Sequence, residues 1–381
     1  MNRTTLGAVA ILALAGVASA QTAGDILFVS NQSNRTGETQ FDTIGFIPGA
    51  GGAATTLYTS TTFDSNFRHV NRGPGGGYYF SDATLFPSSA STGAMFTVDG
   101  LFSGFQGTRN NIATGGLVNS PFDFSYHAPS NSLITINNPS GTGSSDNPED
   151  GITSVALPGG ALTQLFQEPL DSNPNPRYDG GTDIVADPAR PGSYYVLTVN
   201  DGLDGGFSDD APSILWRLTV SNDLTSATVS MVQDFSASQT GFANSIDFAT
   251  SIDVDPATGD VLVTGGQFND GKIYRVGIDG TGASTGVSVF ADIFAEQAAQ
   301  NLSVGALDEI EWDPFNNRWI LAEFLNDGNF SRISAINADG SGYTELATGF
   351  AVNDIIVIPT PGAASMLALA GLAATRRRRS A

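Results

Sequence analysis

A turn motif that recurs along the chain constrains its fold more than any other feature of the sequence. The segment 182–197, T-D-I-V-A-D-P-A-R-P-G-S-Y-Y-V-L, indicates a strand, a tight Asp-Pro turn and a second strand. The same pattern returns as S-I-D-V-D-P from Ser251 and as E-I-E-W-D-P from Glu309. Proline presets φ in such a turn, and a following Asn or Gly tolerates the left-handed conformation. A unit that recurs at a regular period indicates a repeat architecture.

The period of the motif predicts an all-β chain folded as a single β-propeller. A turn proline recurs about every 60 residues, at Pro74, Pro129, Pro188, Pro256 and Pro314. Four strands fit each unit, except that the first unit, from Asp25, lacks its inner strand. The segment 353–358 at the other end of the chain supplies it, so we expect about six four-stranded blades closed by the C-terminal strand. One alternative is a propeller of seven blades, and the other is a pair of β-sandwiches in place of a propeller.

Two details of this prediction concern single segments. The fourth strand of the second unit is expected at 102–106, from its apolar residues. A short helix is expected at 291–301, between the fifth and sixth units.

The three Asp-Pro segments at Asp183, Ser251 and Glu309, each followed by an apolar strand, resemble blades of a broad superfamily of six- or seven-bladed propellers. That group includes the NHL-repeat, strictosidine-synthase-like, gluconolactonase-like and YncE-like propellers. The resemblance covers roughly residues 21–358 and implies a scaffold, because one propeller fold serves many functions.

Charge and composition exclude several functional classes. The chain has 38 acidic and 16 basic residues, a formal charge of -22, so binding to a phosphate backbone is not expected. Such a surface suits an exported protein and attracts cations such as calcium. Cysteine is absent, which rules out disulfides and thiol nucleophiles. Only two histidines exist, too few for a three-histidine zinc site.

The N-terminal 20 residues have the three parts of a secretory signal peptide. Asn2-Arg3 is a short positive region, 6–17 is apolar, and Ala18-Ser19-Ala20 is a cleavage motif. We expect cleavage before Gln21. The alternative is an N-terminal membrane anchor, although the apolar run is shorter than the ~20 residues of a membrane span.

The C-terminal segment 359–381 has a second, equally ordered pattern. Pro359, Thr360 and Pro361 precede an apolar stretch at 364–375, which four arginines follow: Arg376, Arg377, Arg378 and Arg379. This order resembles the PEP-CTERM sorting signal, with Thr360 where that family typically has Glu. The resemblance implies transient anchoring in the inner membrane, cleavage by an exosortase-type transpeptidase, and release to the cell surface or the extracellular matrix. The alternative is an anchor that is never processed.

The inner strands of a propeller direct side chains to the mouth of its channel. Four acidic residues occupy these strands, and we expect them as candidate metal ligands, calcium being the ion that oxygen ligands favour: Asp183, Asp253, Glu309 and Glu311. Asp354 lies on the closing strand. The alternative is that an Asp beside a blade turn caps backbone amides.

The sequence contains two weaker candidates for a functional site, one for calcium binding and one for catalysis. The acidic glycine-rich segment 200–210 has oxygen ligands at calcium-like spacing but lacks the EF-hand pattern, so a solvated loop is the alternative. His127 is a candidate base of a hydrolase, or simply a polar residue beside a turn.

No G-x-S-x-G, Walker or H-E-x-x-H motif occurs, and no catalytic residue is assigned. The sequence therefore favours an exported, non-catalytic propeller that binds extracellular polysaccharide or another exported protein. The alternative is a metal-dependent hydrolase of the lactonase type that uses the channel-mouth carboxylates.

Overall fold

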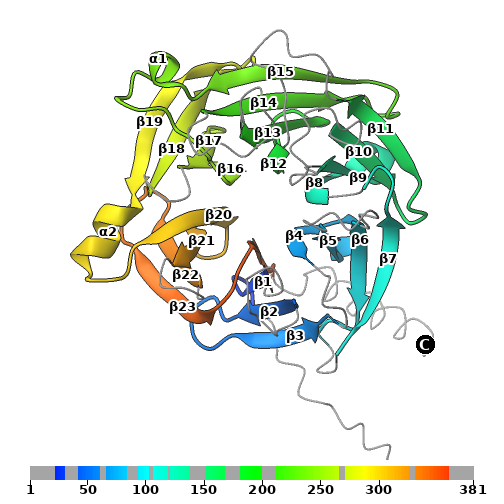
Figure 1. The fold of residues 1–381 in the computed structure, drawn as a ribbon, viewed down its shortest axis with the longest axis horizontal. Coiled ribbons are helices and arrows are strands. Elements are labelled where there is room, and N and C mark those ends of the chain that lie inside the picture. Colours follow the sequence, from blue (N-terminus) through cyan, green and yellow to red (C-terminus); the bar gives the residue numbers. More distant parts are fainter. Residues whose placement is uncertain are drawn as a thin grey trace, which may run out of the picture.

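The described residues form six four-stranded antiparallel sheets arranged in a ring (Figure 1). The computed structural model describes residues 22–30, 42–60, 66–83, 93–102, 106–118, 121–137, 151–167, 181–199, 212–265, 271–325 and 331–359. The β-propeller predicted from the turn motif is confirmed, with six blades rather than seven. One continuous ring replaces the alternative of two β-sandwiches.

The strands of each blade follow one another outward from the central axis (Figure 1). Blade 1 comprises β24 (Asp354–Val357), β1 (Ile26–Ser30), β2 (Thr43–Ile47) and β3 (Thr55–Thr59). Blade 2 comprises β4 (Phe67–Arg72), β5 (Tyr78–Asp82), β6 (Ala94–Asp99) and β7 (Thr108–Thr114). Blade 3 comprises β8 (Pro121–His127), β9 (Ser132–Asn137), β10 (Gly151–Ala156) and β11 (Leu162–Gln167).

The second half of the ring repeats the arrangement. Blade 4 comprises β12 (Gly181–Ala186), β13 (Ser193–Val199), β14 (Ser213–Val220) and β15 (Ala227–Asp234). Blade 5 comprises β16 (Ile252–Val254), β17 (Val261–Thr264), β18 (Lys272–Ile278) and β19 (Ser284–Asp292). Blade 6 comprises β20 (Gly305–Asp313), β21 (Arg318–Leu325), β22 (Ser331–Asn337) and β23 (Thr344–Phe350). Short helices are η1 (Pro74–Gly76), η2 (Ala128–Ser130), α1 (Ala237–Thr240) and α2 (Ile293–Ala299).

The C-terminal strand closes the ring as the innermost strand of blade 1. It pairs antiparallel with β1, with Ile26 opposite Val357 and Val29 opposite Asp354. The predicted pairing of the two ends of the propeller is therefore confirmed. Pairing the last strand with the first unit removes the open edges that an unclosed array would leave.

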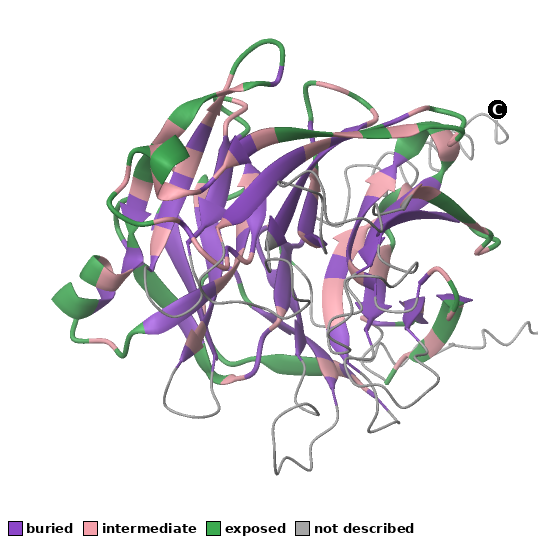
Figure 2. Ribbon diagram, turned by 45° about the horizontal axis from the view of Figure 1, so that its top comes forward, coloured by how far each residue is buried: buried purple, intermediate pink, exposed green. Residues whose placement is uncertain are grey.

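The hydrophobic core lies between neighbouring blades, where sheets pack face to face (Figure 2). The closing strand contributes to two of these layers because successive side chains of a strand point to opposite faces. Ile355 packs with the core between blades 6 and 1, and Ile356 packs with the core between blades 1 and 2. Each fully buried isoleucine contributes about 1.5–3 kcal/mol, so β24 stabilises both neighbours of blade 1.

The aspartate of the Asp-Pro motif organises the turn after the inner strand. Asp187, Asp255 and Asp313 each accept the N–H of the residue two positions on, at 2.9, 2.9 and 3.0 Å. Each carboxylate also pairs with an arginine, respectively Arg190, Arg275 and Arg318. The turns then end on residues in the left-handed conformation, Gly259 (φ 77°) and Asn317 (φ 52°) among them. The turn chemistry expected from the motif is thus present.

A buried polar cluster fixes α2 to blade 6. The carboxylate of Glu323, which is fully buried, accepts hydrogen bonds from Gln297 of α2 at 2.6 Å and from Tyr343 at 2.7 Å. Arg332, 2% exposed, pairs with the same carboxylate at 3.1 Å. The helix expected at 291–301 is confirmed as α2, and this cluster holds it in place.

One strand differs from its prediction. The outer strand of blade 2 is β7, at Thr108–Thr114, and not 102–106. Phe102 instead lies in a turn and packs its ring against Tyr78, with centroids 5.8 Å apart. The apolar residues at this point therefore cover the core from a turn, while the true strand, T-R-N-N-I-A-T, is polar because it is outermost.

Both terminal signals lie largely outside the described residues. These are the predicted signal peptide 1–20, with its predicted cleavage site at Ala18 and Ala20, and the predicted sorting tail from Thr360 onward. Within the described ranges, no helix is long and apolar enough to cross a membrane.

Candidate functional site

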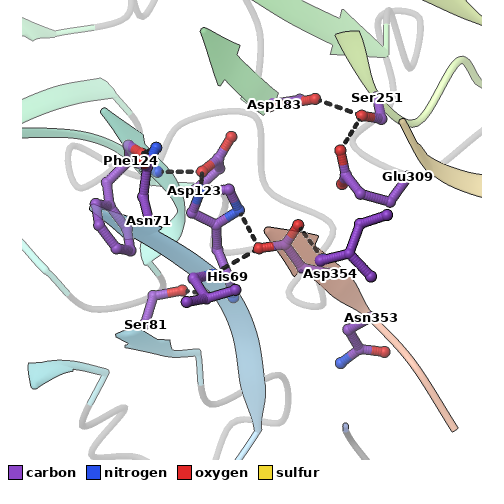
Figure 3. Close-up of polar contacts among 12 residues, drawn as sticks. His69, Asn71, Ser81, Asp123, Phe124, Asp183, Ser251, Glu309, Asn353 and Asp354 are labelled. Atoms are coloured by element: carbon purple, nitrogen blue, oxygen red, sulfur yellow. Dashed lines mark hydrogen bonds and ion pairs between the residues drawn. The ribbon is translucent and has the colours of Figure 1, made fainter. Parts of the chain in front are cut away.

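The inner strands place a polar side chain at one repeated position in the channel. In four blades this side chain stands five residues before the turn proline: His69, Asp183, Ser251 and Glu309. Asp123 of β8 and Asp354 of β24 complete the ring, which we call the channel ring (Figure 3). All six side chains are largely withdrawn from solvent, with Asp123 and Asp354 each 2% exposed and Ser251 fully buried.

His69 forms the cationic centre of the channel ring. Its Nε2 lies 2.5 Å from Oδ1 of Asp123, and its Nδ1 lies 2.7 Å from Oδ2 of Asp354 (Figure 3). The edge of the imidazole also meets the ring of Phe124, with centroids 5.0 Å apart. One histidine therefore joins blade 2 to blade 3 and to the closing strand of blade 1.

A second chain of contacts crosses the opposite side of the ring. The hydroxyl of Ser251 lies 2.8 Å from Oδ2 of Asp183 and also contacts Oε1 of Glu309 (Figure 3). Three neighbouring blades thus meet through one serine. A single hydroxyl has one proton to donate, so one of these two contacts needs a proton held by a carboxyl group.

The channel aspartates also hold neighbouring blades together through the backbone. Oδ2 of each accepts the N–H of a residue on the next inner strand, at 2.6–2.8 Å. The four pairs are Asp354 with Val70, Asp123 with Ile184, Asp183 with Ile252, and Asp253 with Trp312. An intramolecular hydrogen bond contributes about 0.5–1.5 kcal/mol, so these carboxyls stabilise four junctions between blades.

The pair of carboxylates around His69 favours the imidazolium. Burial alone lowers the pKa of His69, but the charges of Asp123 and Asp354 and their hydrogen bonds raise it well above its usual value. Burial disfavours ionisation of Asp123, yet the His69 charge and hydrogen bonds from Asp183 and His69 lower its pKa. His69 and Asp123 therefore form a buried ion pair.

The other carboxyls that line the channel retain their protons to higher pH than carboxyls exposed to water do. Burial, followed by the charge of Asp123, raises the pKa of Asp183 well above its usual value. Burial and the nearby acids do the same for Glu309 and Glu311. Burial also raises the pKa of Asp253, to about 7. Groups with strongly perturbed pKa values in a cleft are candidate functional residues.

A cavity of about 460 Å³ occupies the channel beside these residues. Its lining extends from the channel ring to the turns that follow the inner strands, and it includes Pro188, Pro256 and Phe315. Its volume falls within the range of about 300–1,000 Å³ typical of small-molecule pockets. The channel is the candidate functional site of the described part of the chain.

The structure brings the four predicted acidic residues, Asp183, Asp253, Glu309 and Glu311, to the wall of this one cavity. Among the described residues, however, no group of three or more His, Asp or Glu side chains is arranged to hold a metal ion. The alternative that these residues cap backbone amides accounts for Asp183 and Asp253. The N–H groups that they accept belong to the next blade and not to their own turn. A calcium site at these residues stays a prediction.

Sequence reasoning missed three members of the channel ring: His69, Asp123 and Ser251. His69 and Ser251 have a signal, because both stand at the same distance before a turn proline as Asp183 and Glu309. Asp123 stands one position earlier relative to Pro129 and escapes that rule.

His127, one of the two weaker candidates, does not line the channel cavity. His127 is buried at the end of β8, where its Nδ1 lies 2.7 Å from Oγ of Ser130. Burial lowers its pKa, and its contact is with its own turn. The acidic segment 200–210 lies outside the described residues.

Comparison with known proteins identifies the fold. No protein-family model matches the chain, and no curated protein matches its sequence. Solved structures do match. The periplasmic gluconolactonase PpgL of Pseudomonas aeruginosa gives a TM-score of 0.51 at 13% identity, over 88% of this chain and 99% of that one. A putative gluconolactonase gives 0.52 at 13% identity, over 87% and 95%.

A putative TolB from Agrobacterium tumefaciens gives a TM-score of 0.50 at 10% identity, over 88% of this chain and 94% of that one. Identities this low show the fold alone. The chain is a six-bladed β-propeller similar in fold to proteins named gluconolactonase and TolB, which agrees with the resemblance seen in the sequence.

Proposed function

We propose that the chain is an exported propeller that binds extracellular polysaccharide or another exported protein and performs no catalysis in its channel. The observation that carries the proposal is the use of the channel carboxyls. Asp183, Asp253 and Asp354 each accept a backbone N–H from the neighbouring blade. Their oxygens therefore have a structural task, which supports a rigid binding scaffold.

Export is part of the same proposal. The signal peptide and the tail that resembles a PEP-CTERM signal indicate passage through the inner membrane and processing by an exosortase-type transpeptidase. The acidic composition suits such a route, because a formal charge of -22 keeps a secreted protein soluble. The mature protein then lies at the cell surface or in the extracellular matrix.

A metal-dependent hydrolase of the lactonase type is the second candidate. Two observations favour it: the fold similarity to proteins named gluconolactonase, and the perturbed pKa values of Glu309 and Glu311 beside a cavity. This candidate requires calcium, or another divalent ion, to be held with the help of the channel carboxyls.

Two measurements on the purified mature protein separate the candidates. In a co-sedimentation assay, the folded protein should pellet together with extracellular polysaccharide. A heat-unfolded sample should not bind the polysaccharide, since binding requires the intact ring. Calorimetric titration with calcium, followed by a lactone hydrolysis assay, should show neither a tight site nor turnover. A tight calcium site together with lactone hydrolysis, both lost in Glu311→Gln, would establish the hydrolase instead.

A further inference from the structure

The central cavity has the form of a ligand pocket rather than of a packing defect. Its walls combine apolar residues of the inner strands, such as Ile184, Val254 and Ile356, with convergent polar groups. Phe315, 42% exposed, stands at its rim. Apolar walls with a few placed polar groups are typical of small-molecule sites. Because Phe315 is both exposed and part of the lining, the cavity reaches the surface of the described residues on the face of the Asp-Pro turns.

One side chain in this cavity is available to a ligand. Glu311 lines the wall on β20, and its carboxyl accepts no hydrogen bond within the described part of the chain. Its neighbours act on it only through charge: Asp253, Asp354, Arg72 and His69. Asp253 and Asp354, by contrast, are occupied by backbone N–H groups. A largely buried carboxyl facing a cavity without a donor from the protein is suited to a donor supplied by a ligand.

The balance of charge in the cavity defines what that donor is. Five carboxyls line it, and among the described residues of the lining only His69 and Arg72 can carry positive charge. His69 is enclosed between two aspartates, and Arg72 donates to the carbonyl of Val357 in the closing strand. Carboxyls therefore outnumber cations on the cavity wall, and burial with the charges of Asp253 and Asp354 keeps the proton on Glu311 when no cation is beside it. An ammonium group beside Glu311 lowers the pKa of Glu311 and converts it to the carboxylate that accepts a hydrogen bond. A ligand that carries an ammonium group and several hydroxyls matches this wall.

We propose that the central cavity binds an amino sugar, as a residue at the end of a polysaccharide chain, with its ammonium group at Glu311. The hydroxyl groups of the sugar then donate to the remaining acceptors of the wall, and its C–H face lies near Phe315 at the rim. This inference rests on the proposed function and deepens it, because it names the class of polysaccharide and the residue that selects it.

The experiment compares three monosaccharides that share one ring. Glucosamine, glucose and N-acetylglucosamine are titrated by calorimetry into the mature protein, into Glu311→Gln and into the control Glu296→Gln on α2, away from the cavity. Loss of a charge-assisted hydrogen bond changes affinity by about tenfold or more. We expect glucosamine to bind at least about tenfold more tightly than the other two. Glu311→Gln should remove that preference, and Glu296→Gln should keep it.

Glu311→Gln is expected to fold, because the carboxyl makes no hydrogen bond that the amide would break, and a cooperative thermal transition checks this. Equal affinity for the three sugars, or an unchanged preference in Glu311→Gln, overturns the inference. If polysaccharide is still retained in that case, the proposed function stands without it. If neither polysaccharide nor any sugar binds, polysaccharide binding as the proposed function fails as well, and only binding of another exported protein is left of it.

Discussion

Replacing Asp253 with Asn should change the stability of the propeller in opposite directions at low and high pH. In the wild type, Oδ2 of Asp253 accepts the N–H of Trp312 at 2.8 Å, and Oδ1 accepts the N–H of Val254 at 2.6 Å. Asparagine keeps one acceptor oxygen and turns its amide NH₂ toward the other N–H. An unsatisfied buried donor costs about 1–3 kcal/mol, and this loss is nearly independent of pH.

The ionisation of Asp253 acts the other way. Burial raises its pKa to about 7 in the folded protein, whereas an unfolded aspartate titrates near ~3.9. A carboxyl with a raised folded pKa makes the folded state lose stability as pH rises through this window. With about 1.4 kcal/mol per pKa unit, the wild type loses roughly 3 kcal/mol between about pH 4.5 and about pH 8 through this one group. Asparagine does not ionise, so the variant avoids that loss.

Urea unfolding at the two pH values measures the difference in the free energy of unfolding. We expect Asp253→Asn to be the less stable protein near pH 4.5 and to match or exceed the wild type near pH 8. The control is Asp279→Asn on an exposed turn. Hydrogen bonds from Thr281 and the backbone lower the pKa of Asp279 to about 2, so its difference from the wild type should stay constant. A difference for Asp253→Asn that does not move with pH would refute the reasoning.

Three further predictions concern the ring and blade 6. His69→Gln leaves two buried carboxylates without their cation and should lower the free energy of unfolding by roughly 3–5 kcal/mol; a loss below about 1 kcal/mol in urea would contradict the ion-pair assignment. A chain that ends before Asn353 should lose its cooperative thermal transition, while one that ends at Pro359 should melt like the mature protein. Arg332→Met leaves Glu323 uncompensated and should cost about 3–5 kcal/mol, and adding Glu323→Leu should restore part of that loss.

The sequence predicts the fold of this chain well because its turns are encoded locally. Asp187 and Asp255 fix their turns through contacts with residues only two positions on. The apolar inner strands follow directly, and their period gives the blades. Outer strands are harder to predict, since β7 is polar along much of its length and its pairing with β6 depends on a neighbour rather than on its own pattern.

The candidate site is only partly predictable for the opposite reason. Asp183 and Glu309 could be placed on inner strands, but their meeting through Ser251 depends on three blades coming together. The pairing of His69 with Asp123 and Asp354 depends on the closed ring, and Asp354 is far away along the chain. Burial sets the protonation of these groups, and no local pattern specifies burial in a channel.

Ring closure by the last strand has a consequence for the timing of folding. The backbone N–H of Val70 donates a hydrogen bond to the carboxyl group of Asp354, which lies 284 residues further along the chain. At a synthesis rate of about 5–20 residues per second, roughly 15–60 s separate the appearance of the two partners. During that interval the first blade exposes the edge of β1, so the emerging chain stays vulnerable to proteases and to aggregation. An unpaired N-terminal edge of this kind is a natural target for a holding chaperone until the final strand arrives.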